Sequence, residues 1–211
     1  MFRNTQDGVL AMLVSDKYKV LFVHIPKAGG SCIRKMMWTV DPQCYEYKKH
    51  HSVLDEADAN NFSDYFKFAI VRNSYELCAS FYRFITEKIE EPSERQEPVG
   101  MIDLIEGQLI ETKDSTPWQL SQISNPFPVQ MDWYSKKGKV FVDEVYIYEE
   151  GLDTQMEDLK NKINFQGSLL KEENTNYFGD YDWKKYYDQE SIEYVTRICQ
   201  KDIKHFNFKF N

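Results

Sequence analysis

VLFVHIPKAGGSCIRKMM, residues 20–37, carries the clearest structural pattern in this chain. It reads as a short apolar strand, a glycine-rich turn and an amphipathic helix with Ile33, Met36 and Met37 on one face. Glycines let a backbone approach an oxyanion closely, and the free N–H groups and positive dipole end of a helix start favour that anion. The stretch therefore predicts an anion-binding loop between a strand and a helix.

The order of lysine and glycine in this loop excludes one common template. A Walker A loop has the pattern G-x-x-x-x-G-K-[ST], with the lysine after the glycines. Here Lys27 precedes Gly29 and Gly30. The loop therefore differs from the phosphate loop of ATPases and GTPases, and we expect it to bind a phosphate in another way.

Two segments carry a resemblance to a known family. HIPKAGGSCI, residues 24–33, resembles the HIPKTGGTS signature of the carbohydrate-type sulfotransferases, which include the heparan sulfate 2-O-sulfotransferases and many small bacterial members. FAIVRNSYELCASFYRF, residues 68–84, resembles the VRDPYERLVSAYRF element of the same family. The two elements keep the family's order and lie about 45 residues apart, so together they form a specific signal. The matching positions of the second element are Arg72, Tyr75, Glu76, Ser80 and Tyr82.

The resemblance extends more weakly over most of the chain. Residues 12–26 resemble the family's entry hairpin, residues 141–159 its strand-then-helix segment, and residues 183–208 its C-terminal helix. Some positions depart from the family pattern. Ala28 and Cys32 replace hydroxyl residues of the phosphate loop, Ser74 replaces a proline and Leu77 replaces an arginine.

The resemblance implies a sulfotransferase that uses PAPS (3′-phosphoadenosine 5′-phosphosulfate). Such an enzyme moves a sulfuryl group to an acceptor oxygen or nitrogen and leaves adenosine 3′,5′-bisphosphate. In-line transfer requires positioning and stabilisation of charge on the leaving oxygen. We assign that stabilisation to Lys27, whose ammonium would lie beside the bridging oxygen. The alternative is that Lys27 only neutralises a resting phosphate.

The resemblance also implies which residues bind the two phosphate ends of PAPS. The 5′ end would bind to the loop itself, through backbone N–H groups and the Ser31 hydroxyl. The 3′-phosphate would bind Arg72 and Ser80, a planar bidentate donor and a hydroxyl. The alternatives are that Ser31 caps the helix and that Arg72 forms a structural ion pair. Beside Lys27, the cofactor-binding loop residues are Ala28, Gly29, Gly30, Ser31 and Cys32.

A general base for the acceptor is expected between the two phosphate elements. KKHHSVLDEAD, residues 48–58, resembles the family's H-x-[ST] segment, whose histidine is the base in the 2-O-sulfotransferases. That register places His50 on the family histidine, with His51 as the other candidate. A histidine titrates near neutrality, which suits the task. The alternative is a pair of exposed loop histidines.

The order of the predicted elements indicates an α/β fold in a single domain over residues 1–211. A hairpin precedes the loop. The helices and strands that follow alternate, which predicts a P-loop-like three-layer domain with a mainly parallel sheet flanked by helices. In such sheets ligands bind beyond the C-terminal strand ends, so we expect the nucleotide to stretch between Lys27 and Arg72. The expected elements are helix 31–38, strand 67–71, helix 75–88, a strand within 140–148, a helix with apolar positions 152, 156, 159 and 163, and helix 189–206.

Charge and composition limit the partners. The chain of 211 residues has a net charge of −8, which argues against nucleic acid or an anionic membrane surface as the main partner. A small-molecule or weakly charged carbohydrate acceptor fits this balance better. No apolar run approaches the ~20 residues of a membrane span, so we expect a cytoplasmic protein. The four cysteines show no metal or disulfide spacing, and we predict no metal. The sequence is silent on oligomeric state.

Two rival functions stay open. One is an ATP-dependent nucleotide or small-molecule kinase, which the lysine–glycine order and the missing acidic Mg²⁺ ligand at a strand end disfavour. The other is a nucleotide-binding module without catalysis, which the residues at positions 28 and 32 would suit. The acceptor could be a sugar, phenol, steroid, alkaloid or amine. The aromatic and glycine content of residues 174–183 is typical of a lid over the nucleotide, and an ordinary surface loop is the alternative. Gln130 and Trp133 are candidates to line an acceptor pocket.

Overall fold

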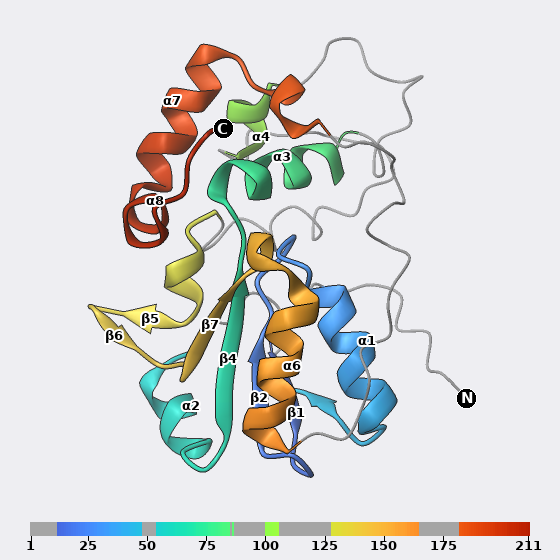
Figure 1. The fold of residues 1–211 in the computed structure, drawn as a ribbon. Helices are drawn as coiled ribbons and strands as arrows, with labels where there is room; N and C mark the ends of the chain where they lie inside the picture. Colours follow the sequence, from blue (N-terminus) through green and yellow to red (C-terminus); the bar gives the residue numbers. More distant parts are fainter. Residues whose placement is uncertain (1–11, 48–53, 85, 87–99, 106–127, 165–181) are drawn as a thin grey trace, which may run out of the picture. The chain divides into compact units, whose positions relative to one another are not determined.

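The described part of the chain contains a five-stranded mixed sheet (Figure 1). The structure is a computed structural model that describes residues 12–47, 54–84, 86, 100–105, 128–164 and 182–211. The strand order is β3-β1-β2-β4-β7. The strands are β1 (Met12–Ser15), β2 (Val20–Val23), β3 (Tyr45–Glu46), β4 (Phe66–Val71) and β7 (Glu144–Ile147).

The predicted α/β class is confirmed, and the sheet is mixed, with a parallel part and an antiparallel part. β2, β4 and β7 run parallel, with Phe22 opposite Phe68 and Ile70 opposite Tyr146. β1 is antiparallel to both β2 and β3. The physical reason is local, because the short turn of residues 16–19 joins β1 to β2 as a hairpin, and a hairpin is always antiparallel.

The described residues group into two compact units that divide between Val71 and Arg72. The first unit holds the sheet, α1 (Gly30–Val40), α2 (Glu56–Asn61), α6 (Leu152–Ile163), η4 (Tyr148–Glu150) and the hairpin of β5 (Ser135–Lys136) and β6 (Lys139–Val140). The second holds α3 (Ser74–Phe84), α4 (Met101–Ile105), η6 (Trp183–Tyr186), α7 (Gln189–Ile198) and α8 (Gln200–Phe206). The helical turn η3 (Gln130–Trp133) spans the second division, after Met131.

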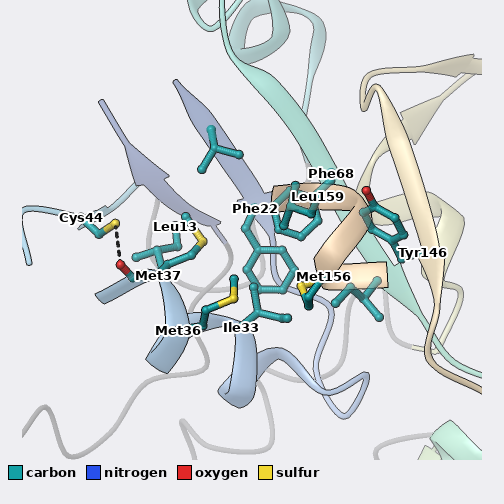
Figure 2. Close-up of a cluster of buried hydrophobic side chains, with 12 residues drawn as sticks. Leu13, Phe22, Ile33, Met36, Met37, Cys44, Phe68, Tyr146, Met156 and Leu159 are labelled. Carbon is teal, nitrogen blue, oxygen red and sulfur yellow. Dashed lines mark hydrogen bonds between the residues drawn. The ribbon is translucent and has the colours of Figure 1, made fainter. Parts of the chain in front are cut away.

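One face of the sheet is covered by α1 and α6, which share a single hydrophobic cluster (Figure 2). Phe22 and Phe68 stack at the centre of that face, with ring centroids 4.9 Å apart. The apolar spacing predicted for residues 152–163 is confirmed, because Met156 and Leu159 of α6 are buried in this cluster. Each fully buried aromatic or aliphatic side chain contributes about 1.5–3 kcal/mol, so this layer anchors the start of α1 to the sheet.

The second unit is organised by aromatic rings. Phe210, near the C-terminus, contacts the rings of Tyr75, Trp183 and Tyr187 edge-on, at centroid distances of 5.0–5.3 Å. The hydroxyl of Tyr187 donates to the backbone carbonyl of Tyr75 at 2.7 Å. These contacts fix the first turn of α3 against the C-terminal segment.

The helix predicted for residues 189–206 is interrupted. Cys199 ends α7 with φ −93° and ψ 15°, and α8 begins at the next residue. The change of direction brings the carboxylate of Asp202 to backbone N–H groups of η3, an interaction that local sequence does not reveal. No helix in the described ranges is long and apolar enough to cross a membrane.

Candidate functional site

The predicted loop follows β2 and begins with a strained lysine. Ile25, Pro26, Lys27 and Ala28 form a turn in which the Ala28 N–H donates to the Ile25 carbonyl at 3.4 Å. Lys27 has φ +66°, and a turn with proline second and a positive φ third has the pattern of type II, whose third position favours glycine. A left-handed backbone at a non-glycine residue costs about 1–2 kcal/mol. The strain therefore falls on the residue that the sequence predicts to be catalytic.

The start of α1 is arranged to receive an anion. Gly29 precedes the helix in the left-handed conformation, with φ +82°, and no side chain caps the helix. In the described part of the chain, no hydrogen bond engages the N–H groups of Gly29, Gly30 and Ser31. The first turn of α1 also lacks an acidic residue. Backbone donors and the positive end of the helix dipole are thus available at one point.

Two other helices, α2 and α7, begin differently. α2 and α7 start at Asp55 and Asp188, whose carboxylates accept hydrogen bonds from the N–H groups of Asp58 and Ser191. Each is a capping box, which satisfies the first donors of the helix internally. The glycine start of α1 leaves the same donors for a ligand.

Two rings pack directly against the glycines of the loop. A Cβ placed on Gly30 would overlap the imidazole ring of His24, which lies at the end of β2 and is 8% exposed. A Cβ placed on Gly29 would lie 2.9 Å from the ring of Tyr148, at the end of β7, and 3.3 Å from Leu152. Only glycine fits at either position without displacing a neighbour.

The remaining loop residues differ in what they expose. Ser31 is exposed and Lys27 is half-buried, so both side chains reach the surface of the loop. Ala28 is 1% exposed, and its N–H is engaged within the turn. The Cys32 N–H donates to the Gly29 carbonyl at 3.2 Å. The donors presented to a ligand are therefore those of residues 29–31, whereas the sequence predicted backbone donors from residues 29–32.

Arg72, the second predicted anion residue, follows the last residue of β4 and is held through its backbone. The Gln130 side chain accepts from the Arg72 N–H and donates to the Arg72 carbonyl, both at 2.7 Å. The Asp202 carboxylate accepts from the N–H groups of Gln130 at 2.6 Å and Met131 at 3.0 Å. Gln130 and Asp202 are each 0% exposed. A buried chain of hydrogen bonds thus fixes the point where β4 leads into α3.

The Arg72 guanidinium donates to the Glu76 carboxylate at 3.0 Å, as an i,i+4 pair. The side chains are 12% and 21% exposed. Ser80 lies one further turn along α3 and is half-buried. Glu76 and Ser80 share one face of α3, so the guanidinium that contacts Glu76 lies on the helix face that carries Ser80. The ion-pair alternative for Arg72 is present in the structure, and the pair directs the guanidinium along the face that carries Ser80.

Several predicted residues lie elsewhere. His50 and His51 fall outside the described residues, as do residues 174–181 of the proposed lid. Trp183 belongs to η6 and to the aromatic cluster around Phe210. Gln130 and Trp133 were expected to line an acceptor pocket, but they are 0% and 1% exposed. The Gln130 amide instead supports Arg72.

Three residues of this geometry were not foreseen. The sequence patterns assigned no site role to His24, Tyr148 or Asp202. The paired glycines carried a signal for His24 and Tyr148, because adjacent glycines often mark a close approach of another group. Asp202 carried no such signal, since its partners are 71 and 72 residues away.

No group of three or more histidine, cysteine, aspartate or glutamate side chains that could hold a metal ion occurs within the described ranges. Comparison with protein-family models, with curated proteins and with solved structures found no match to this chain.

Proposed function

We propose that this chain is a PAPS-dependent sulfotransferase that moves a sulfuryl group to a hydroxyl or amine of a small-molecule or carbohydrate acceptor. One observation carries the proposal. The Lys27–Ser31 loop joins a cationic side chain to open backbone donors at the start of α1, without an acidic residue in the first turn. We also propose that the α/β unit is a P-loop-like three-layer fold, because its loop follows a parallel strand and leads into a helix that covers the sheet.

The chemistry assigned to the loop is in-line transfer. The acceptor oxygen attacks sulfur, the bond from sulfur to the bridging oxygen of PAPS breaks, and adenosine 3′,5′-bisphosphate leaves. Lys27 stabilises the negative charge that develops on the bridging oxygen. The N–H groups of residues 29–31 and the Ser31 hydroxyl bind the adjacent phosphate. The acceptor proton passes to His50 or His51.

The 3′-phosphate is assigned to Arg72, which precedes α3, and to Ser80 on α3. Glu76 orients the guanidinium in the absence of nucleotide, and the buried contacts of Gln130 hold the Arg72 backbone. A guanidinium offers five donors, so it can bind a phosphate while it keeps one carboxylate contact. A second phosphate site at Arg72 and Ser80 favours adenosine 3′,5′-bisphosphate over a nucleotide that carries a phosphate only at its 5′ end.

Thermal unfolding with three nucleotides tests the proposal. A ligand at 100 times its dissociation constant adds about 2.7 kcal/mol, which raises the melting temperature by about 5–11 °C for a chain of this size. Adenosine 3′,5′-bisphosphate should give a clearly larger shift than adenosine 5′-monophosphate. Arg72→Ala should remove the difference, whereas Lys204→Ala, which deletes an exposed cation on α8, should keep it.

The other outcomes separate the rival functions. Equal shifts with the two adenosine nucleotides, or a larger shift with Mg-ATP, would contradict the sulfotransferase proposal and favour a kinase. Binding of the bisphosphate without PAPS consumption, across a panel of hydroxyl and amine acceptors, would indicate a nucleotide-binding module without catalysis.

A further inference from the structure

The Lys27–Ser31 loop is shaped by contacts from two other parts of the first unit. His24 directly follows β2, and Tyr148 directly follows β7 as the first residue of η4. The imidazole occupies the place of a side chain at Gly30, and the Tyr148 ring lies against Gly29. The two contacts meet Gly29 and Gly30, two of the three residues whose N–H groups form the open donor set.

The rings are themselves fixed. His24 stacks on Phe22 at a centroid distance of 5.8 Å, and Phe22 stacks on Phe68 in the centre of the sheet. Tyr148 packs against the hydrophobic cluster that α1 and α6 share, as does Leu152 beside it. The core of the sheet thus contacts Gly30 through Phe22 and His24, and the hydrophobic cluster contacts Gly29 through Tyr148.

At position 30, the contact with the His24 ring requires glycine, whereas the backbone conformation does not. Gly29 has a positive φ, so a side chain there would be strained whatever the space around it. Gly30 is the first residue of α1 and has no positive φ, so its backbone conformation does not require glycine. The obstacle to a side chain at position 30 is therefore the His24 ring.

We propose that His24 and Tyr148 are positioning residues that hold the Lys27–Ser31 loop in the shape that binds the 5′ phosphate end of PAPS. The inference rests on the proposed function. It assigns no chemical step to either ring. Each acts by occupying space, so that the donors of residues 29–31 stay aligned before the nucleotide arrives, and a loop that is already ordered loses less entropy on binding.

A size exchange between positions 24 and 30 tests this role. Gly30→Ala should weaken binding of adenosine 3′,5′-bisphosphate about tenfold or more, because the added methyl displaces the loop from the His24 ring. His24→Ala together with Gly30→Ala should recover most of that loss, since the alanine at position 24 makes room for the methyl. His24→Phe keeps a ring at this place and should retain most of the affinity. Tyr148→Phe should likewise bind better than Tyr148→Ala.

The measurements are calorimetric dissociation constants and denaturant unfolding of every variant. A Gly30→Ala variant that binds as tightly as wild type would overturn the positioning role. So would a double variant that binds no better than Gly30→Ala alone while both unfold at the same denaturant concentration. Loss of binding in His24→Phe, with stability retained, would show that the imidazole nitrogens act directly and would overturn the steric role. If the wild-type chain binds no bisphosphate, the proposed function fails first, and the unfolding data still show whether the ring and the glycine are in contact.

Discussion

Replacing Lys27 by glycine should yield a more stable protein than replacing it by alanine. Both changes remove the ammonium group, but only glycine relieves the left-handed backbone, which has φ +66°. The relief is about 1–2 kcal/mol, and the greater freedom of glycine in the unfolded chain offsets about 0.5–1 kcal/mol of it. The net difference of about 1 kcal/mol corresponds to a melting temperature about 2–4 °C higher for Lys27→Gly in a chain of this length.

The assay is thermal unfolding of the two variants with and without adenosine 3′,5′-bisphosphate. Without nucleotide, Lys27→Gly should unfold at the higher temperature. With nucleotide, both variants should show a much smaller shift than wild type, because the charge that meets the nucleotide is gone. The pattern would show that the chain keeps a strained lysine, where glycine is more stable, for the sake of its charge.

A matched control comes from Lys137, at the tip of the β5–β6 hairpin. It is another left-handed lysine, with φ +52°, and it is exposed. Lys137→Gly should also be more stable than Lys137→Ala, and neither change should alter the nucleotide shift. If Lys27→Ala is as stable as Lys27→Gly while the Lys137 pair differs as expected, the strain at Lys27 is refuted. If nucleotide shifts survive in both Lys27 variants, its role in binding is refuted.

Further predictions concern the base, the cysteines and pH. His50→Ala should lower kcat by roughly 10²–10⁴ with nucleotide binding nearly unchanged, whereas His51→Ala should cost much less; the reverse result in a PAPS-consumption assay would move the base by one residue. Cys32 is half-buried while the other cysteines are buried, so an alkylating reagent should modify Cys32 first, as detected by peptide mass spectrometry. Adenosine 3′,5′-bisphosphate should slow this alkylation, and an equal rate with and without it would contradict a nucleotide beside α1. Burial raises the pKa of Cys44 from 9.0 to about 12, so between these pH values the folded state keeps a proton that the unfolded state loses. The free energy of unfolding therefore has its full contribution from Cys44 below pH 9 and decreases as the pH rises toward 12. Cys44→Ala should therefore reduce the slope of unfolding free energy against pH by one proton in that window; an unchanged slope would contradict the assignment.

Much of the fold was predictable because its signals are local. The helix predicted for residues 31–38 spans Gly30–Val40, and the strand predicted for residues 67–71 spans Phe66–Val71. Apolar periodicity and glycine positions report directly on short segments, since they depend on neighbours within one or two turns. Periodicity does not report which strands pair, which is why the antiparallel pairing of β3 with β1 was not foreseen.

The candidate site was predictable only in part. The loop residues Lys27, Gly29 and Gly30 and the pair Arg72 and Ser80 were located from short patterns. Their supports were not, because the contacts of Gln130 with Arg72 and of Asp202 with Gln130 join residues 58 and 72 positions apart. No local pattern distinguishes a buried glutamine that braces a backbone from one that lines a pocket.

The sequence by itself determined that a glycine-rich turn joins a buried strand to an amphipathic helix, because glycine content, apolar spacing and the order of lysine and glycine are properties of a few adjacent residues. Only the tertiary structure decided that Lys27 adopts a left-handed backbone and that Gly30 must leave room for His24. Both depend on how β2, β7 and α1 pack around the loop. Packing is set by the summed contacts of distant segments, and these contacts exist only once the chain has folded.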